Sequence, residues 1–157
     1  MIPRQPLEAP CSLYCGVCRL YQATQSSDVE TLARLARVYS RLAPELANLN
    51  GQELLCDGCL SSRRSATCQS CRIRDCAAER GLAGCHQCVD FPCEHIHSFP
   101  IDSGRRVMLR AVPFRRREGT AAWIGHEVKR YRCPVCHRKL YRGVTVCPGC
   151  LLKVDLD

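Results

Sequence analysis

The spacing of apolar residues predicts one amphipathic helix in the first third of the chain. Between Val29 and Leu42, apolar residues recur every three or four positions, which places them on one face of a helix. Ser27 and Glu30 have the spacing of a capping box, in which the two side chains satisfy free backbone amides at the helix start. We therefore expect this helix to begin directly after Ser27.

Three shorter helices are predicted further along the chain. Proline favours the first turn of a helix, and glycine favours the position just beyond its end. The predicted helices run from Pro44 to a stop at Gly51, from Ile73 to Arg80 before Gly81, and from Thr120 to Arg130.

Residues 98–119 have a different pattern. They contain no cysteine, and six arginines lie between positions 105 and 117. Proline or glycine recurs at positions 100, 104, 113 and 119, and such residues interrupt regular structure. This segment is predicted to be a hinge or a partly ordered linker.

The last predicted element is a β-hairpin. Lys139–Tyr141 and Val144–Val146 flank the turn sequence Arg142-Gly143. Short runs of this kind on either side of a glycine-containing turn are typical of a two-stranded ribbon.

The apolar core that these elements can form is small. The hydrophobic share of 46% includes 15 cysteines, and the chain of 157 residues has only one Trp, three Phe and five Tyr. Small cores are usually supplemented by disulfides or metal ions. The cysteines are the candidates for such cross-links.

Cysteine spacing favours metal ligation over disulfides. Six pairs follow the pattern C-x2-C, which presents two thiolates of a tetrahedral metal site. The sequence MIPRQPLEAP at the start lacks the apolar run of a signal peptide, and no stretch approaches the ~20 apolar residues of a membrane span. We therefore expect a cytoplasmic metal-binding protein without membrane contact. The candidate ligands are Cys11, Cys15, Cys18, Cys56, Cys59, Cys68, Cys71, Cys76, Cys85, Cys88, Cys93, Cys133, Cys136, Cys147 and Cys150.

The last four cysteines give the most specific signal. From Cys133 to Cys150 the spacing is C-x2-C-x10-C-x2-C, with the predicted hairpin between the two pairs. Four thiolates on such a frame are typical of a structural zinc ribbon. One zinc ion is predicted here.

The other eleven cysteines predict two or three more sites, for a total of three or four zinc ions. One economical grouping has three sets. They are Cys56, Cys59, Cys68 and Cys71; Cys76, Cys85, Cys88 and Cys93; and Cys11, Cys15 and Cys18 with a fourth ligand from His86, His95 or His97. An interleaved grouping is equally physical, because neighbours in sequence need not share a metal.

Residues 11–95 resemble a cysteine-rich family of bacteria and archaea known as domain of unknown function 3795. The motifs are YCGVC at 14–18, CDGC at 56–59, CQSCRIRDCAAERG at 68–81 and GCHQCVDFPCE at 84–94. Members often append a zinc ribbon after a segment similar to GTAAWIGHEVKRYRCPVC, which is present at 119–136. The resemblance implies cysteine-bound metal and brings no established activity.

An iron–sulfur cluster in the N-terminal region is the alternative to zinc, because all-thiolate sites suit both. Cys11, Cys15 and Cys18 have the C-x3-C-x2-C spacing of radical S-adenosylmethionine enzymes, but the chain is too short for the barrel that those enzymes need. Thioredoxin-like catalysis is disfavoured because no βαβ pattern surrounds a C-x2-C pair. A small iron–sulfur or thiol redox protein is the second interpretation.

The excess positive charge lies in the last third of the chain. Residues 104–157 contain 13 basic and 4 acidic side chains, within a formal net charge of +8 for the whole chain. Arginine binds phosphate and aromatic rings stack on bases, so the expected partner is either nucleic acid or another protein. The candidate nucleic-acid contacts are Arg105, Arg106, Arg110, Arg115, Arg116, Arg117, Trp123, Arg130 and Arg132.

These patterns together predict a small, metal-stabilised α+β protein. Its expected parts are a helical, knuckle-rich domain with several metals over residues 1–97, an Arg-rich linker over residues 98–119, and a helix plus a zinc-ribbon β-hairpin over residues 120–157. The predicted function is that of a non-enzymatic zinc-binding interaction module.

Overall fold

The computed structural model describes residues 7–42 and 46–157. Within these residues the chain forms six α-helices, connected by loops and short 3₁₀ turns, and no β-strand. The predicted α+β class is therefore wrong, and the fold is helical. The helices are α1 (Arg19–Gln25), α2 (Val29–Leu42), α3 (Arg72–Glu79), α4 (Glu94–His97), α5 (Asp102–Glu118) and α6 (Thr120–Arg130).

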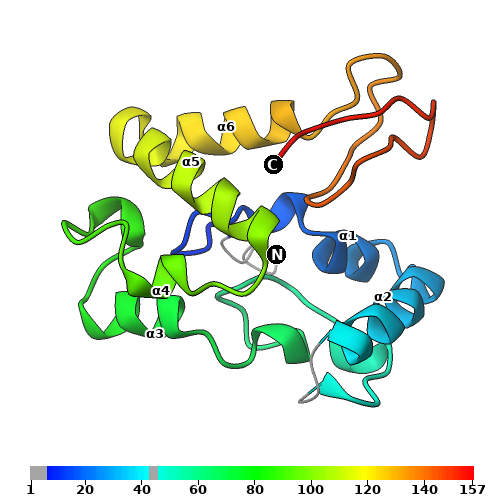
Figure 1. Cartoon of the computed structure of the whole chain (residues 1–157), viewed down its shortest axis with the longest axis horizontal. Coiled ribbons are helices and arrows are strands. Elements are labelled where there is room, and N and C mark those ends of the chain that lie inside the picture. Colours follow the sequence, from blue (N-terminus) through cyan, green and yellow to red (C-terminus); the bar gives the residue numbers. More distant parts are fainter. Residues whose placement is uncertain (1–6, 43–45) are drawn as a thin grey trace, which may run out of the picture.

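The helices pack as three pairs. Helix α1 packs against α2, and α3 packs against α4. Figure 1 shows α5 and α6 side by side across the molecule, with the C-terminal loops, drawn orange to red, beyond the end of α6. No helix in the described part of the chain combines the length and apolar character needed to cross a bilayer.

Helix α2 buries most of the apolar face that its sequence predicts, although Val29 at its start is exposed. Leu32 and Ala36 pack against Leu20 of α1 in one hydrophobic cluster. The predicted cap is wrong by one residue, because the amide of Thr31 donates a hydrogen bond of 2.9 Å to Asp28. Ser27 instead has a positive φ of 55° in the turn that joins the two helices.

The two later helices are confirmed almost residue for residue. Helix α6 has the predicted bounds, and α3 ends one residue before Arg80 with Gly81 at φ +65°. Pro44, the expected start of another helix, lies outside the described residues.

The segment expected to be a linker contains the longest helix, α5, which has 17 residues. A proline inside a helix costs about 3 kcal/mol, and α5 contains Pro113. The buried face of α5 outweighs this cost, because Val107, Met108 and Val112 are fully enclosed and each contributes roughly 1.5–3 kcal/mol. Gly119, at φ +86°, then separates α5 from α6.

The predicted C-terminal β-hairpin is also not formed. A turn hydrogen bond from the amide of Val144 to the carbonyl of Tyr141, 3.2 Å long, joins its two segments, but they form no β-bridge with each other. Instead, the residues on either side of each cysteine pair form an isolated β-bridge with each other, Arg132 with Lys139 and Val146 with Lys153. We call each such closed loop around a cysteine pair a knuckle. The backbone of the two segments bonds within each knuckle, from the amide of Leu140 to the carbonyl of Tyr131 and from the amide of Val154 to the carbonyl of Thr145.

Cysteine sulfur takes part in the apolar core. The cluster between the C-terminal loops and the N-terminal region contains Cys133 and Cys147. The α1–α2 cluster contains Cys56, and a third cluster contains Cys11 beside Met108. The fourth cluster joins α5 to α6 around Trp123, which is fully buried.

The ion pair between Arg110 and Glu127 gives a first test of the α5–α6 packing. Glu127 is fully buried and lies 2.7 Å from Arg110. We expect Arg110→Ala to lower the free energy of unfolding by about 3 kcal/mol, because the buried carboxylate loses its closer partner and keeps only a 3.4 Å contact with His126. Urea unfolding of the metal-loaded protein measures this change.

The matched control for this prediction is Arg106→Ala on the same helix. Arg106 is exposed and makes only a 3.5 Å ion pair with Asp102. Its replacement should change stability by less than about 0.5 kcal/mol. Equal losses in the two variants would contradict the importance of the buried pair.

Candidate metal centres

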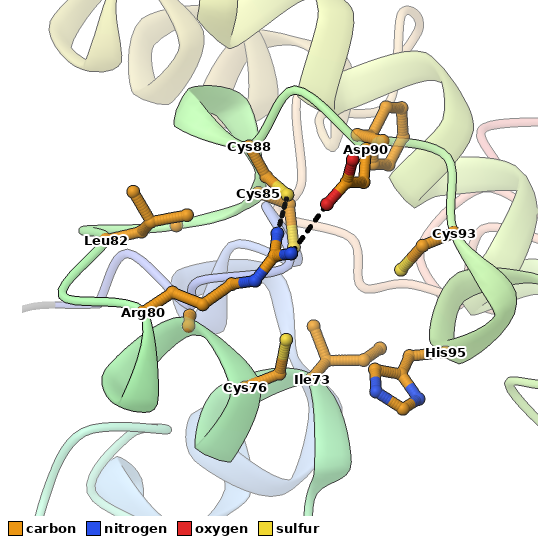
Figure 2. Close-up of a pocket in the computed structure, with 12 residues that line it drawn as sticks. Ile73, Cys76, Arg80, Leu82, Cys85, Cys88, Asp90, Cys93 and His95 are labelled. Carbon is orange, nitrogen blue, oxygen red and sulfur yellow. Dashed lines mark hydrogen bonds and ion pairs between the residues drawn. The ribbon is translucent and has the colours of Figure 1, made fainter.

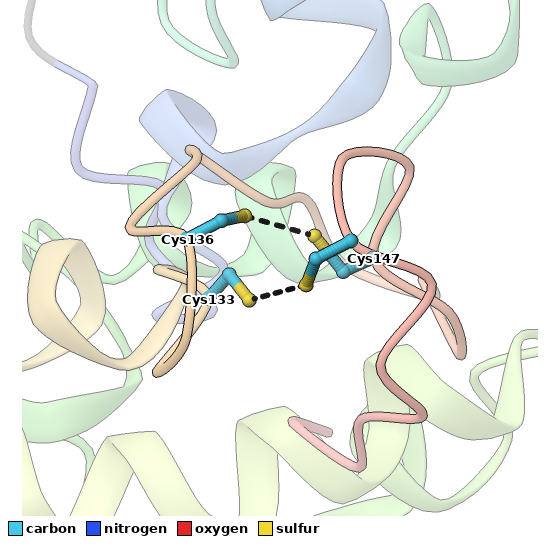
Figure 3. Close-up of side chains that lie close together, drawn as sticks. Cys133, Cys136 and Cys147 are labelled. Carbon is cyan, nitrogen blue, oxygen red and sulfur yellow. Dashed lines mark hydrogen bonds between the residues drawn. The ribbon is translucent and has the colours of Figure 1, made fainter.

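The last four cysteines converge on one point. Among the described residues they are the only group of His, Cys, Asp or Glu in which all candidate ligand atoms lie within 4.8 Å of one another. Cys133 Sγ lies 3.5 Å from Cys150 Sγ, and Cys136 Sγ lies 3.5 Å from Cys147 Sγ. Figure 3 shows Cys133, Cys136 and Cys147 turned toward one another. Zinc–sulfur bonds of about 2.3 Å give a tetrahedral edge of about 3.8 Å. The four thiols therefore fit a single ion.

The two C-terminal knuckles are copies of one local fold. In the first, the amides of Cys133 and His137 bond to the carbonyls of Arg138 and Cys133. In the second, the amides of Cys147 and Leu151 bond to the carbonyls of Leu152 and Cys147. His137 and Leu151, each four residues after the first cysteine of its pair, both have positive φ. The repeat explains how one C-x2-C sequence, used twice, builds two facing halves of a site.

Backbone amides prepare this centre for a cation. Hydrogen bonds from the amides of Cys136 and Val135 lower the pKa of Cys133 to about 6. At Cys147 burial raises the pKa, but the amides of Cys150 and Gly149 outweigh it and the pKa is lowered. Cys133 and Cys147 are buried, whereas Cys136 and Cys150 are exposed. The two buried cysteines therefore favour the thiolate form, and the two exposed cysteines form the rim of the centre.

A second set of four cysteines surrounds a cavity of about 160 Å³. Figure 2 shows the four side chains around this cavity, which α3, the turn Cys85–Gln87 and the start of α4 enclose. Burial and the neighbouring thiol of Cys93 raise the pKa of Cys85 to about 11. The members of this set are Cys76, Cys85, Cys88 and Cys93.

Arg80 supplies positive charge to this second set. Its guanidinium donates hydrogen bonds to Cys88 Sγ at 2.9 Å and to the Asp90 carboxylate at 2.6 Å. Arg116 of α5 holds the same loop by donating to the carbonyls of His86 and Cys88. The loop that carries Cys85 and Cys88 is therefore fixed by two arginines.

The remaining seven cysteines belong to neither of these two sets. They are Cys11, Cys15, Cys18, Cys56, Cys59, Cys68 and Cys71. In one direct contact the amide of Cys59 donates to Cys15 Sγ at 3.3 Å. The structure thus places Cys15 next to a cysteine that the economical grouping assigns to a different metal.

None of the three candidate histidines joins that group of seven. His95 lines the cavity around Cys93, and His97 is exposed. His86 lies beside Arg115 and Arg116, and burial followed by these two charges lowers its pKa.

Most of the candidate nucleic-acid contacts make interactions within the chain. Trp123 is fully buried between Tyr14 and Arg115, whose guanidinium lies 4.5 Å from the indole ring. Arg130 bonds to the carbonyl of Leu156. Four candidates remain solvent-exposed: Arg106, Arg116, Arg117 and Arg132. Arg105 and Arg110 are partly buried and pair with Asp102 and Glu127.

A family model matches residues 7–98, which is more than half of the chain. Its description is "Protein of unknown function (DUF3795)". The chain belongs to this family. The match ends before α5, so the C-terminal four-cysteine centre lies outside the part that the DUF3795 model covers. Comparison with curated proteins and with solved structures gives no match.

Sequence reasoning missed the arginines that face sulfur in this DUF3795 member. Arg142 was assigned only to a turn, yet its guanidinium donates to the carbonyl of Tyr14 at 2.9 Å. Burial lowers the pKa of Arg142, but the charges of Cys18, Tyr131 and Cys11 raise it by more. No local pattern marks such a residue, because its cysteine neighbours are more than 120 positions away in sequence.

The C-terminal centre can be tested at its exposed rim. The double variant Cys136→Ser/Cys150→Ser leaves two thiolates, which is too few to retain a structural ion. We expect its metal content, measured by mass spectrometry of the purified protein, to fall by one ion per chain. The control Val135→Ser/Leu151→Ser changes two exposed neighbours of these cysteines and should keep the full metal content. Equal metal content in both variants would contradict the site.

Proposed function

We propose that this DUF3795 protein is a non-enzymatic zinc-binding module. In this proposal its fifteen cysteines hold zinc ions that shape a surface for a partner. The observation that carries the proposal is the convergence of four C-terminal thiols within 4.8 Å of one another. A four-thiolate site has no open position, and such closed sites are structural in zinc proteins.

The sulfur spacing favours a single ion over a cluster at the C-terminal centre. An iron–sulfur cluster inserts several iron and sulfide atoms between its cysteine ligands. Its ligand sulfurs therefore lie further apart than those around one ion. The 3.5 Å separations between Cys133 and Cys150 and between Cys136 and Cys147 suit one zinc ion.

The proposed partner is anionic and binds the basic C-terminal third. Support comes from the exposed arginines, including Arg106, Arg117 and Arg132, in a region with 13 basic and 4 acidic residues. Such a surface attracts nucleic acid and acidic proteins alike. Because Trp123 is buried, the contact we propose is electrostatic, through arginine and phosphate, and does not use stacking on this ring.

Metal analysis tests the zinc assignment. We expect the purified protein to contain zinc and to be colourless. Chelation should unfold it, because structural zinc in a small domain contributes on the order of 10–16 kcal/mol. Circular dichroism before and after chelation measures this loss. A brown protein with iron and visible absorbance would support the iron–sulfur alternative, and a verified metal-free protein with unchanged melting would contradict both.

Salt dependence tests the partner. We expect binding to a single-stranded RNA probe to weaken steeply as salt rises, because bound cations on the nucleic acid are released by the protein. Replacement of Arg106, Arg117 and Arg132 by glutamine should reduce both the affinity and the salt dependence. Replacement of Arg34, Arg37 and Arg41 on α2 provides a control of equal charge change. RNA binding that is absent, or that the control reduces as much, would instead favour a protein partner.

A further inference from the structure

A groove of about 930 Å³ lies between α1, α6 and the first C-terminal knuckle. Helix α1 lines it with Tyr21 and Gln25, and α6 lines it with Ile124 and Val128. Residues four positions apart share one face of a helix, so each helix presents one face to the groove. The groove therefore joins the part of the chain that the DUF3795 model covers to the part outside it.

Two cations of the first knuckle line this groove. Arg132 and Lys139 are both exposed, and they lie directly opposite each other in the isolated β-bridge. Backbone hydrogen bonds donated by the amides of Cys133 and Leu140 flank the bridge. The bridge is thus a non-hydrogen-bonded pair, in which opposite Cα atoms approach to about 4.5 Å. Like charges that face each other in this way destabilise the pairing.

The second knuckle shows that the fold does not need this pair of like charges. It has the same pattern of backbone hydrogen bonds, and its own isolated bridge joins the equivalent positions, just before the first cysteine and just after the second. Those positions hold Val146 and Lys153, so only one of them is a cation. Neither belongs to the described lining of the groove. The like-charge pair is therefore present only in the knuckle that borders the groove.

The two knuckle cations also lack an acidic partner. In the described part of the chain neither Arg132 nor Lys139 forms an ion pair, and the Arg132 guanidinium makes only a 3.4 Å hydrogen bond to the carbonyl of His137. By contrast, the exposed α5 residues Arg106 and Arg117 both pair with carboxylates. The knuckle pair is consequently the more available site for an anion.

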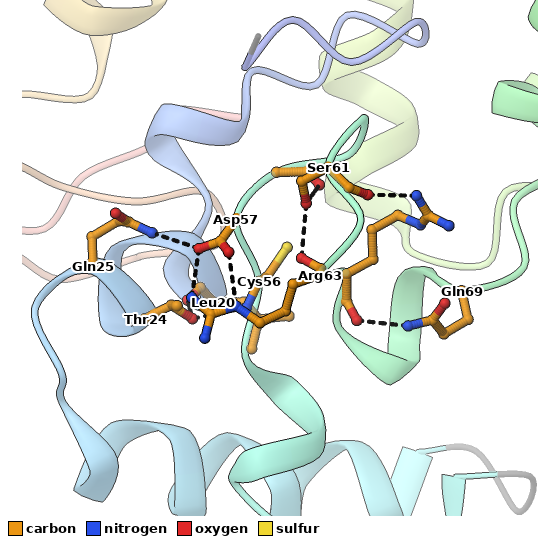
Figure 4. Close-up of polar contacts among 10 residues, drawn as sticks. Leu20, Thr24, Gln25, Cys56, Asp57, Ser61, Arg63 and Gln69 are labelled. Carbon is orange, nitrogen blue, oxygen red and sulfur yellow. Dashed lines mark hydrogen bonds and ion pairs between the residues drawn. The ribbon is translucent and has the colours of Figure 1, made fainter. Parts of the chain in front are cut away.

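The two acidic residues that line the groove face other cations. Asp57 accepts hydrogen bonds of 2.7 and 2.8 Å from Arg63 and one of 3.1 Å from Gln25 (Figure 4). Glu8 has one carboxylate oxygen enclosed by protein. Burial lowers the pKa of Arg115, and the charge of Glu8 acts in the opposite direction. The charge that the groove offers to a ligand is therefore positive.

We infer that this groove binds a segment of single-stranded nucleic acid. One phosphate lies between Arg132 and Lys139, and the neighbouring bases lie between Tyr21 and Val128. Arginine supplies paired donors to a phosphate, and lysine adds a point charge. Unpaired strands are held by grooves that combine such cations with aromatic side chains, on which bases stack. The inference rests on the proposed function, because it assigns a site and a chemical class to the anionic partner.

The charge pair is tested by fluorescence anisotropy, with a labelled oligouridine and the zinc-loaded protein. We expect Arg132→Gln/Lys139→Gln to weaken binding by about tenfold. The slope of log affinity against log salt should fall by about 1, because a phosphate contact is lost. The control Arg106→Gln/Arg117→Gln removes the same charge from α5 and should weaken binding by less than about threefold. Equal losses in the two variants would overturn the assignment of the phosphate to the knuckle pair.

The two helical walls are tested in the same assay. Tyr21→Leu should weaken binding by about fivefold or more at unchanged salt dependence, because stacking is lost, whereas Tyr21→Phe keeps the ring and should bind as the wild type. Val128→Glu should weaken binding by placing a negative charge in the groove. Its control is Leu109→Glu on α5, since the two residues are similarly exposed, 39% and 37%. Wild-type affinity in both Tyr21→Leu and Val128→Glu would overturn the inference.

A second measurement uses the unaltered protein and does not depend on the folding of variants. An oligouridine that contains thiouridine is cross-linked to the protein by light, and the modified peptides are identified by mass spectrometry. Cross-links are expected in α1 near Tyr21 and in α6 near Val128. Cross-links confined to α2 or α5 would place the strand elsewhere and contradict the groove.

The outcomes separate this inference from the proposed function. A protein that binds oligouridine equally well without its knuckle cations keeps the anionic partner and contradicts only the groove. A zinc-containing protein that binds polyglutamate but not oligouridine has an acidic protein as its partner. That result retains the zinc-binding module and overturns the inference. A protein that binds neither polyanion contradicts both the anionic partner and the groove.

Discussion

A buried cysteine is stable as a thiolate only with positive charge nearby, and the arginine contacts of this structure are best understood from that constraint. Cys11, Cys56, Cys133 and Cys147 are buried within apolar clusters. Burial raises the pKa of Cys15 to about 12, so without a cation such a thiol stays protonated. Metal ions and guanidinium groups are the two sources of charge that make buried thiolates stable. The chain has abundant arginine, and the structure brings several of these side chains to the sulfurs.

The arginine-rich segment is therefore part of the scaffold as well as a surface. Arg115 stacks on buried Trp123 and donates to the carbonyl of Ala9, next to the first cysteine region. Arg116 holds the loop of Cys85 and Cys88 through its carbonyls. Helix α5 thus braces two cysteine regions at once. Several arginines of α5 therefore make contacts within the chain, and the exposed ones are those available to contact a partner.

The C-terminal knuckles share a core with the N-terminal region. Val17 packs with Tyr131, Leu140 and Val144, and Gln22 donates to the carbonyl of Leu140 at 3.0 Å. Arg142 reaches from the same loops to the carbonyl of Tyr14. The C-terminal knuckles and the turn Cys15–Val17 therefore share one apolar cluster. A loss of order at one end would expose apolar surface at the other.

The sequence by itself determined the local features of this protein. It identified the cysteine pairs, the four C-terminal ligands that converge, the apolar face of α2 and the bounds of α6, because spacing and periodicity act over a few residues. Only the tertiary structure decided that residues 102–118 are a packed helix, since burial of Val107 and Met108 outweighs Pro113. It also decided that each knuckle pairs with its own flanks, and that Cys15 meets Cys59 across 44 positions. Spacing determines which thiols can bind metal, whereas packing of distant segments determines which of them meet.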